Sequence, residues 1–134
     1  MALGPLVVDT SAYSWAARNN PTAVDRMRRA QALLLPSIAL GELLAGFANG
    51  NREAQNRALL HEFLASPRVR VVPTTAETAE RYRAIVVTLR RQGTPIPTND
   101  IWIAAVAMEA GVPVLTSDDD FNRVPQIIVD WIPS

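Results

Sequence analysis

The sequence predicts a single α/β domain over residues 1–134, a three-layer sandwich with helices on both faces of a mostly parallel sheet of about five strands. Three observations predict it. A chain of 134 residues has the size of one domain and can bury a core without covalent cross-links. Short apolar runs alternate with longer helical patterns, as in repeated βα units. No repeat or low-complexity segment interrupts this alternation.

The first two strands are expected in the first quarter of the chain. Residues 6–8 form an apolar run, and Thr10 or Ser11 is expected to cap the short helix that follows. Residues 22–32 have the apolar spacing of a helix with one inward face. Residues 33–35 are three leucines and form the second expected strand.

A proline at position 36 ends that strand, and Ser37 is expected to cap the next helix. The i, i+3, i+4, i+7 spacing that is typical of a buried helix face occurs there at Leu40, Leu43, Leu44 and Phe47. A further helix over residues 52–64 leads to a third strand over residues 69–72.

The last part of the chain contains the longest helix and the most apolar one. Residues 75–92 are amphipathic, and Gly93 is expected to end that helix. The run IWIAAVAMEAG is apolar nearly all round, so we expect a helix in the middle of the fold. Residues 114–116 form the fourth expected strand and residues 127–129 the fifth.

The composition excludes several kinds of catalyst. Cysteine is absent, which excludes disulfides, cysteine zinc sites and thiol nucleophiles. One histidine, His61, is present, so an HExxH zinc helix is impossible; it has no evident catalytic partner and is expected to be structural or exposed. All basic residues are arginine, which excludes a P-loop lysine, a Schiff base and the lysine of phosphoaspartyl phosphatases and receiver domains.

Charge and hydropathy indicate where the protein acts. The formal net charge is zero, so bulk electrostatics does not by itself indicate a nucleic-acid binder. The chain begins without the basic and apolar regions of a signal peptide, and no stretch approaches the roughly 18 apolar residues of a membrane span. We therefore expect a cytoplasmic protein without membrane contact.

Four carboxylates stand where this fold would bring them together: Asp9, Glu42, Asp100 and Asp118. Asp9 and Asp118 follow the first and fourth strands, at the sheet edge where ligands gather in open parallel sheets. Glu42 borders the apolar face of one helix, and Asp100 begins another. Carboxylates held close together repel, and a hard divalent cation such as Mg²⁺ or Mn²⁺ removes that conflict. The pattern predicts a metal site that activates water against a phosphodiester bond.

Each acid also has a purely structural interpretation. Asp9 could cap a helix, Asp100 is favoured by the helix dipole, and the acids from Asp118 onward could form a solvated turn. Glu42 is harder to explain in this way, because it borders an apolar face. Only the convergence of all four predicts the metal site.

Four motifs follow one another in a specific order over nearly the whole chain. They are VVDTS at the first strand, LGELLAG on the helix after the second, an ND-apolar-x-apolar-AA run over residues 99–105, and VLTSDDDF near the end. In this order they resemble PIN-domain proteins, and among these the stand-alone VapC toxins of type II toxin–antitoxin pairs. The resemblance implies a PIN-like fold.

The resemblance also implies an Mg²⁺- or Mn²⁺-dependent endoribonuclease whose products carry a 5′-phosphate and a 3′-hydroxyl. Its catalytic and metal-binding residues would be Asp9, Glu42, Asp100 and Asp118. Supporting hydroxyl and amide groups, expected to orient water or phosphate, would come from Thr10, Ser11, Thr116 and Asn99.

Three consecutive aspartates leave open which one completes the site. Asp118 fits the TxD pattern of the family and is the preferred ligand. Asp120 is the alternative, as a second ligand or a supporting residue, and Asp119 is expected to face solvent because neighbouring side chains diverge.

The resemblance further implies a cognate VapB-like antitoxin, an RNA substrate and a homodimer. RNA phosphates could contact Arg26, Arg28, Arg29, Arg90 and Arg91, although for any single one of them a solvated helix face is the favoured interpretation. The alternative function is a catalytically weak PIN-like protein-binding or regulatory module. Such a module would be expected to lose an acid, and none is lost here.

Overall fold

The structure is a computed structural model that describes residues 3–133. Within these residues the strands form one five-stranded sheet of order β3-β2-β1-β4-β5, with every neighbouring pair parallel. The strands are β1 (Leu6–Val8), β2 (Leu33–Pro36), β3 (Val69–Val72), β4 (Val114–Thr116) and β5 (Val129–Trp131). The helices are α1 (Thr10–Ala17), α2 (Pro21–Arg29), α3 (Ser37–Ala48), α4 (Glu53–Leu64), α5 (Ala76–Gln92), α6 (Thr98–Ala110) and the 3₁₀ helix η1 (Asp119–Arg123).

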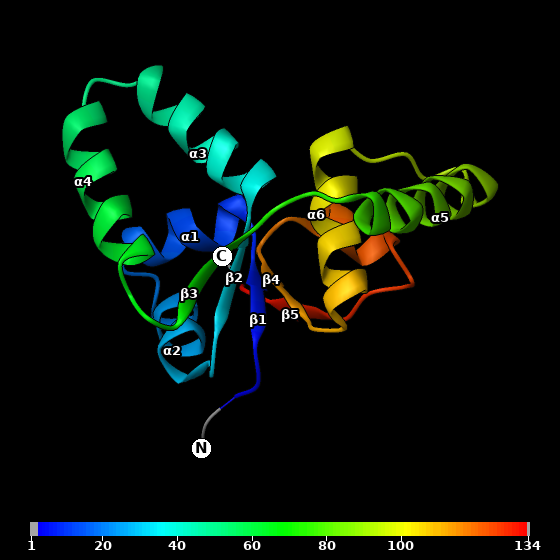
Figure 1. The fold of residues 1–134 in the computed structure, drawn as a ribbon, viewed down its shortest axis with the longest axis horizontal. Helices are drawn as coiled ribbons and strands as arrows, with labels where there is room; N and C mark the ends of the chain where they lie inside the picture. The colour runs from blue at the N-terminus through cyan, green and yellow to red at the C-terminus, as the bar shows by residue number, and fades with distance from the viewer. Residues whose placement is uncertain (1–2, 134) are drawn as a thin grey trace.

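The direction in which the chain crosses the sheet explains the three layers. From β1 to β3 the chain moves one way and carries α1 to α4, and from β3 it returns to β4 through α5 and α6. Because crossovers between parallel strands are right-handed, reversing the direction changes the face that the helices cover. Figure 1 shows α1 to α4 on one side of the strands and α5 with α6 on the other. The predicted α/β/α sandwich with a parallel sheet of five strands is confirmed.

Strands β1 and β4 lie side by side at the centre of the sheet. The direction in which successive strands are added reverses between them. All residues of these two strands are buried, as their unbroken apolar character predicts. In open α/β sheets the loops leave such neighbouring strands in different directions, and ligands bind in the crevice outside their carboxyl ends. Asp9 and Asp118 occupy the chain just after these ends.

Helix α6 is the central helix that its composition predicts. Six of its residues are buried, namely Ile101, Ile103, Ala104, Ala105, Val106 and Ala107. Helix α5 packs against it and ends as expected at Gly93, whose φ of 71° is left-handed. The two helices therefore form a hairpin joined by residues 93–97, which brings the end of α5 beside the beginning of α6.

The fifth strand differs from the prediction. It covers Val129–Trp131 and not residues 127–129, because pairing with β4 sets its position: Val114 pairs with Val129 and Thr116 with Trp131. Ile128 precedes the strand and is 67% exposed. The apolar run there spans a turn and the beginning of a strand, which hydropathy alone cannot separate.

The helix starts also differ from the prediction. Asp9, rather than Thr10 or Ser11, caps α1 by accepting a hydrogen bond from the backbone of Ala12. Ser37 is the first residue of α3, and no side chain of the described chain caps that helix. Helix α2 ends at Arg29, because Ala30 turns extended and bridges to Leu3. Across residues 3–133, no helix combines the length and apolar character that crossing a bilayer requires.

Candidate metal centre

Asp9 lies at the end of β1 and is 3% exposed. Its Oδ1 accepts hydrogen bonds from the backbone of Ala12 at 2.7 Å and from Ser11 Oγ at 2.8 Å, and its Oδ2 accepts one from Thr116 Oγ1 at 2.6 Å. Burial raises the pKa of Asp9 to about 6, the nearby charge of Asp118 adds to this, and the three hydrogen bonds counteract it. Asp9 is both a helix cap and a carboxylate at the crevice.

Three other carboxylates come together beside it. Oxygens of Asp100, Asp118 and Asp120 lie within 4.8 Å of one another, and all three residues are partly buried. Burial raises the pKa of Asp100 to about 8, with further contributions from the charge of Asp118 and a hydrogen bond to it, and from the charges of Asp120 and Glu42. Asp100 therefore keeps its proton to a higher pH than an exposed aspartate does.

Glu42 reaches this group from α3, and both of its oxygens are held. Thr10 Oγ1 donates to Oε1 at 2.6 Å, and Asn99 Nδ2 donates to Oε2 at 3.3 Å. Thr10 begins α1 and Asn99 lies in the first turn of α6, so side chains from three helices meet at one carboxylate. The structure thus brings the four predicted acids to one crevice.

The three consecutive aspartates separate as turn geometry requires. Asp118 caps η1 by accepting the backbone N–H of Asp120 at 2.9 Å, and Asp120 also forms an ion pair with Arg123 at 2.8 Å. Asp119 is exposed and its Oδ1 accepts a hydrogen bond from Asn122. Both Asp118 and Asp120 lie beside Asp100, so the two alternatives for the completing acid are not exclusive.

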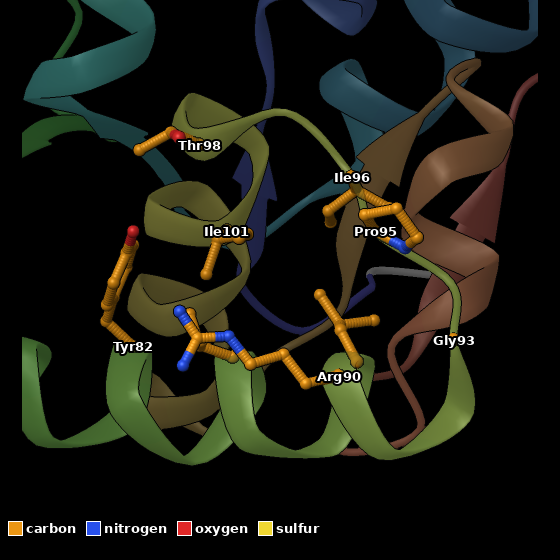
Figure 2. Close-up of a pocket in the computed structure, with 9 residues that line it drawn as sticks. Tyr82, Arg90, Gly93, Pro95, Ile96, Thr98 and Ile101 are labelled. Carbon is orange, nitrogen blue, oxygen red and sulfur yellow. The ribbon is translucent and has the colours of Figure 1, made fainter.

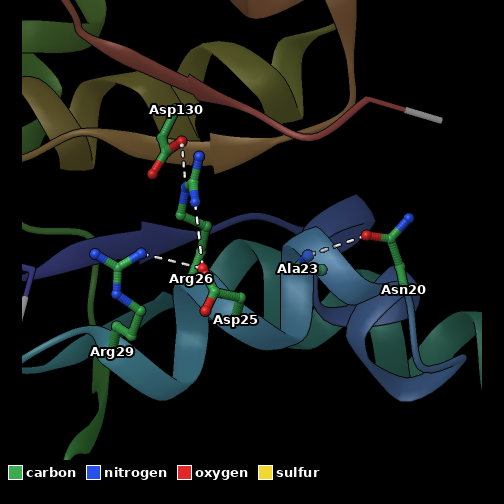
Figure 3. Close-up of polar contacts among 6 residues, drawn as sticks. All are labelled: Asn20, Ala23, Asp25, Arg26, Arg29 and Asp130. Carbon is green, nitrogen blue, oxygen red and sulfur yellow. Dashed lines mark hydrogen bonds and ion pairs between the residues drawn. The ribbon is translucent and has the colours of Figure 1, made fainter.

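Two of the three arginines of α2, Arg26 and Arg29, form ion pairs with acids of the chain. Arg26 pairs with Asp130 at 3.2 Å and with Asp25 at 3.3 Å, and Arg29 pairs with Asp25 at 3.2 Å (Figure 3). The backbone carbonyl of Arg29 also accepts the backbone N–H of Leu3, so the end of α2 lies beside the residues that precede β1. Arg26 and Arg29 thus already have acidic partners within the described residues, and RNA contact by Arg26, Arg28 and Arg29 stays a prediction.

Arg90 and Arg91 lie in the last turn of α5, at the end of the helical hairpin where Asp100 also lies. Arg90 lines a cavity of about 420 Å³ between α5 and α6, together with Tyr82 and Thr98, and Figure 2 shows its side chain extended along α5 toward Tyr82. The Tyr82 ring stacks on Trp102 of α6 with centroids 4.1 Å apart. This cavity is separate from the acids but shares with them the first turn of α6.

Sequence reasoning missed one residue, Ser117, which contacts the supporting residue Ser11 and the indole of Trp15. Its backbone N–H donates to Ser11 Oγ at 3.0 Å, and its own Oγ accepts a hydrogen bond from Trp15 Nε1 at 2.9 Å. The only signal in the sequence is that Trp15 lies four residues after Ser11, which puts both on one face of a helix.

Comparison with known proteins identifies the family. A model of the PIN domain matches residues 6–127. The chain is 32% identical over 94 residues to ribonuclease VapC4 of Mycobacterium tuberculosis, a match that covers 69% of this chain and 71% of that protein.

Solved structures have the same fold. VapBC2 from Rickettsia felis, bound to a promoter DNA fragment, gives a TM-score of 0.85 at 21% identity over 98% of this chain and 100% of that one. VapBC-5 from Mycobacterium tuberculosis, a member of the VapBC family of toxin–antitoxin systems, gives 0.78 at 25% identity over 96% and 98%. The sheet, the acidic crevice and these matches show that the chain belongs to the PIN domain family and, within it, to the VapC-type proteins.

Proposed function

We propose that this protein is a divalent-metal-dependent endoribonuclease toxin of the VapC type, held inactive by a VapB-like antitoxin. One observation carries the proposal: carboxylates of Asp100, Asp118 and Asp120 meet within 4.8 Å at the switch in strand order, with Asp9 and Glu42 around them. The similarity to a VapC ribonuclease and to a VapBC toxin–antitoxin protein supports both the activity and the partner.

The residues of the crevice fit Mg²⁺ or Mn²⁺. Every available ligand is a carboxylate oxygen, the donor type that these hard cations prefer. Burial and the charges of Asp118, Asp120 and Glu42 disfavour ionised Asp100 and raise its pKa, and a bound divalent cation would compensate for this cost. Asp9, Asp100 and Asp118 would hold the ion, with Asp120 as a further ligand. When bound, the ion supplies a Lewis acid that activates water and neutralises phosphate charge.

The remaining polar groups of the chain orient the acids. Thr116 and Ser11 donate to Asp9 and thereby favour its ionised form. Hydrogen bonds from Thr10 and Asn99 fix the carboxylate of Glu42, which accepts a proton from the attacking water. Attack of that water on phosphorus, in line with the bond to the leaving 3′ oxygen, yields a 5′-phosphate and a 3′-hydroxyl.

The proposed function also includes the domain organisation, the homodimer and the residues that contact RNA. Residues 1–134 act as one nuclease domain in the cytoplasm, and two copies form a homodimer. Arg90 and Arg91 contact phosphates of the RNA, because they lie at the same end of the α5–α6 hairpin as Asp100. Arg26 and Arg29 contribute less to RNA binding than Arg90 and Arg91, since they already pair with Asp25 and Asp130.

The test is cleavage of total cellular RNA by purified protein freed of antitoxin, with Mg²⁺, Mn²⁺ or EDTA. We expect discrete fragments that require the metal and are lost with Glu42→Gln. Asp119→Asn is the matched control, because it removes an exposed charge next to the site, and it should cleave as the unmodified protein does. Metal binding and antitoxin binding without any cleavage would instead favour the protein-binding module.

A further inference from the structure

We propose that Trp15 is a positioning residue for the metal centre: its indole, together with Ser11, clamps Ser117 and so fixes the loop that carries Asp118. The inference extends the proposed function. The clamp itself follows from the hydrogen bonds, and only its role in catalysis rests on the proposed nuclease activity. Trp15 is partly buried and packs against the core, so an aromatic ring alone would satisfy the packing. The indole N–H is the feature that packing does not require.

Ser117 is held twice from a single helix. Ser11 Oγ accepts the backbone N–H of Ser117 at 3.0 Å, and Trp15 Nε1 donates to its Oγ at 2.9 Å. Ser11 and Trp15 are four residues apart on α1, so their side chains project from the same face of the helix. One contact fixes the backbone of Ser117 and the other its side chain, which leaves this residue little freedom to rotate.

The clamp links the two acids that follow the central strands. Ser11 Oγ donates to Asp9 Oδ1 at 2.8 Å and lies 3.3 Å from Thr116 Oγ1. Thr116 Oγ1 in turn accepts the backbone N–H of Asp118 at 2.8 Å. Ser117 is the residue between these two, so its position determines how Asp118 faces Asp9. Ligands displaced by about 1 Å lose much of their effect on a reacting centre.

Trp15 is itself held in place. The Arg18 guanidinium lies over its ring, with the carbon Cζ 4.7 Å from the ring centroid, and Arg18 Nε donates to the carbonyl of Ser14 at 3.3 Å. The indole is thus fixed between Arg18 and the core, with its N–H directed at the loop. A phenylalanine at this position would keep the ring and the contact with Arg18 but could not donate to Ser117.

The decisive experiment compares Trp15→Phe, Ser117→Ala and the double variant by calorimetric titration with Mg²⁺ and Mn²⁺ alone, beside thermal unfolding. Each single variant should weaken metal binding by about threefold to tenfold, as expected for loss of one hydrogen bond. The double variant should be no weaker than the singles, because both remove the same contact. Ser117→Thr, which keeps the hydroxyl, should restore binding, and Trp131→Phe at the exposed edge of β5 is the matched control.

Nuclear magnetic resonance supplies a readout that does not depend on RNA cleavage. The three tryptophans give three indole N–H signals, and the signal lost in Trp15→Phe belongs to Trp15. Ser117→Ala should shift that signal, and Mg²⁺ should perturb it more than the signal of Trp131. Cleavage kinetics of the same variants should show a reduced kcat with KM little changed.

The inference is overturned if Ser117→Ala leaves the Trp15 signal in place, or if the effects of the two single variants on metal affinity add. It is also overturned if metal affinity falls only in proportion to a lower melting temperature. Should Trp15→Phe fold poorly, Ser117→Ala and Ser117→Thr still decide the question. If metal binding depends on the clamp but no RNA is cleaved, the proposed nuclease function is wrong and the inference about the clamp still holds.

Discussion

Asp9 shows how a single residue can serve the fold and the site together. It caps α1 and accepts hydrogen bonds from Ser11 and Thr116 although it is almost fully buried. A rise of the Asp9 pKa from 3.8 to about 6 means that ionisation costs about 3 kcal/mol more than in water. A cation bound beside Asp9 would offset this free energy of ionisation.

We predict that Asp9→Asn abolishes cleavage, by at least about 100-fold, without unfolding the protein. The amide oxygen can still accept from Ala12, and the Thr116 hydroxyl can accept from the new N–H₂ group. Thermal unfolding without metal at pH 8 should give an equal or higher Tm than the unmodified protein. A clearly lower Tm would mean that the cap needs the charge itself.

The hydrogen bond from Thr116 lowers the pKa of Asp9 and partly offsets the effect of burial. Thr116→Val removes the hydroxyl that donates to Asp9 and accepts the backbone N–H of Asp118, so the free energy of unfolding should fall by about 1–2 kcal/mol. Because that hydrogen bond lowers the pKa of Asp9, its loss should move the acidic limb of Mg²⁺ binding to higher pH. Thr116→Ser is the control, and titration of metal binding between pH 5 and 8 is the measurement.

At the scale of elements, helix ends bring side chains to the crevice. Asp9 caps α1, Asp100 lies two residues after the start of α6, and Asp118 caps η1. The sequence predicts these helices well, since apolar spacing is a local property. It predicts their caps less well, because Thr10 and Ser11 have the same capping ability as Asp9 until the fold assigns them other partners.

Two glycines, one at the end of a helix and one inside a helix, test how the backbone conformation of a glycine contributes to stability. Gly111 ends α6 with a φ of 69°, where an L side chain is strained, so Gly111→Ala should lower the free energy of unfolding by about 1 kcal/mol. Gly46 lies on the exposed face of α3 with nothing within 4 Å of an added Cβ, so Gly46→Ala should raise it by about 0.5–1 kcal/mol. Denaturant unfolding measures both, and equal effects would contradict the assignment.

At the scale of the whole molecule, the acidic crevice makes stability depend on pH and metal together. Asp9 and Asp100 have pKa values raised from 3.8 to about 6 and about 8. Between these values and 3.8 the folded protein binds more protons than the unfolded chain. Its stability without metal therefore falls as the pH rises through this window.

We predict that the metal-free protein has a higher Tm at pH 5 than at pH 8, and that Mg²⁺ raises the Tm more at pH 8. The cation binds the ionised carboxylates of the folded state and compensates the repulsion that proton loss creates. Scanning calorimetry at both pH values, with Mg²⁺ or EDTA, measures the effect. Asp100→Asn should flatten the pH dependence, whereas Asp119→Asn should leave it unchanged.

The sequence by itself determined the layers, four of the five strand positions and the four acids that converge, because alternation of apolar runs and the carboxyl ends of strands are readable locally. The remaining features depend on contacts between segments far apart in the chain. The register of β5 depends on pairing with β4, the partners of Arg26 lie on α2 and β5, and Asp120 joins Asp100 through the turn of η1. The clamp of Trp15 on Ser117 joins positions 102 residues apart, and no local pattern encodes a hydrogen bond over that separation.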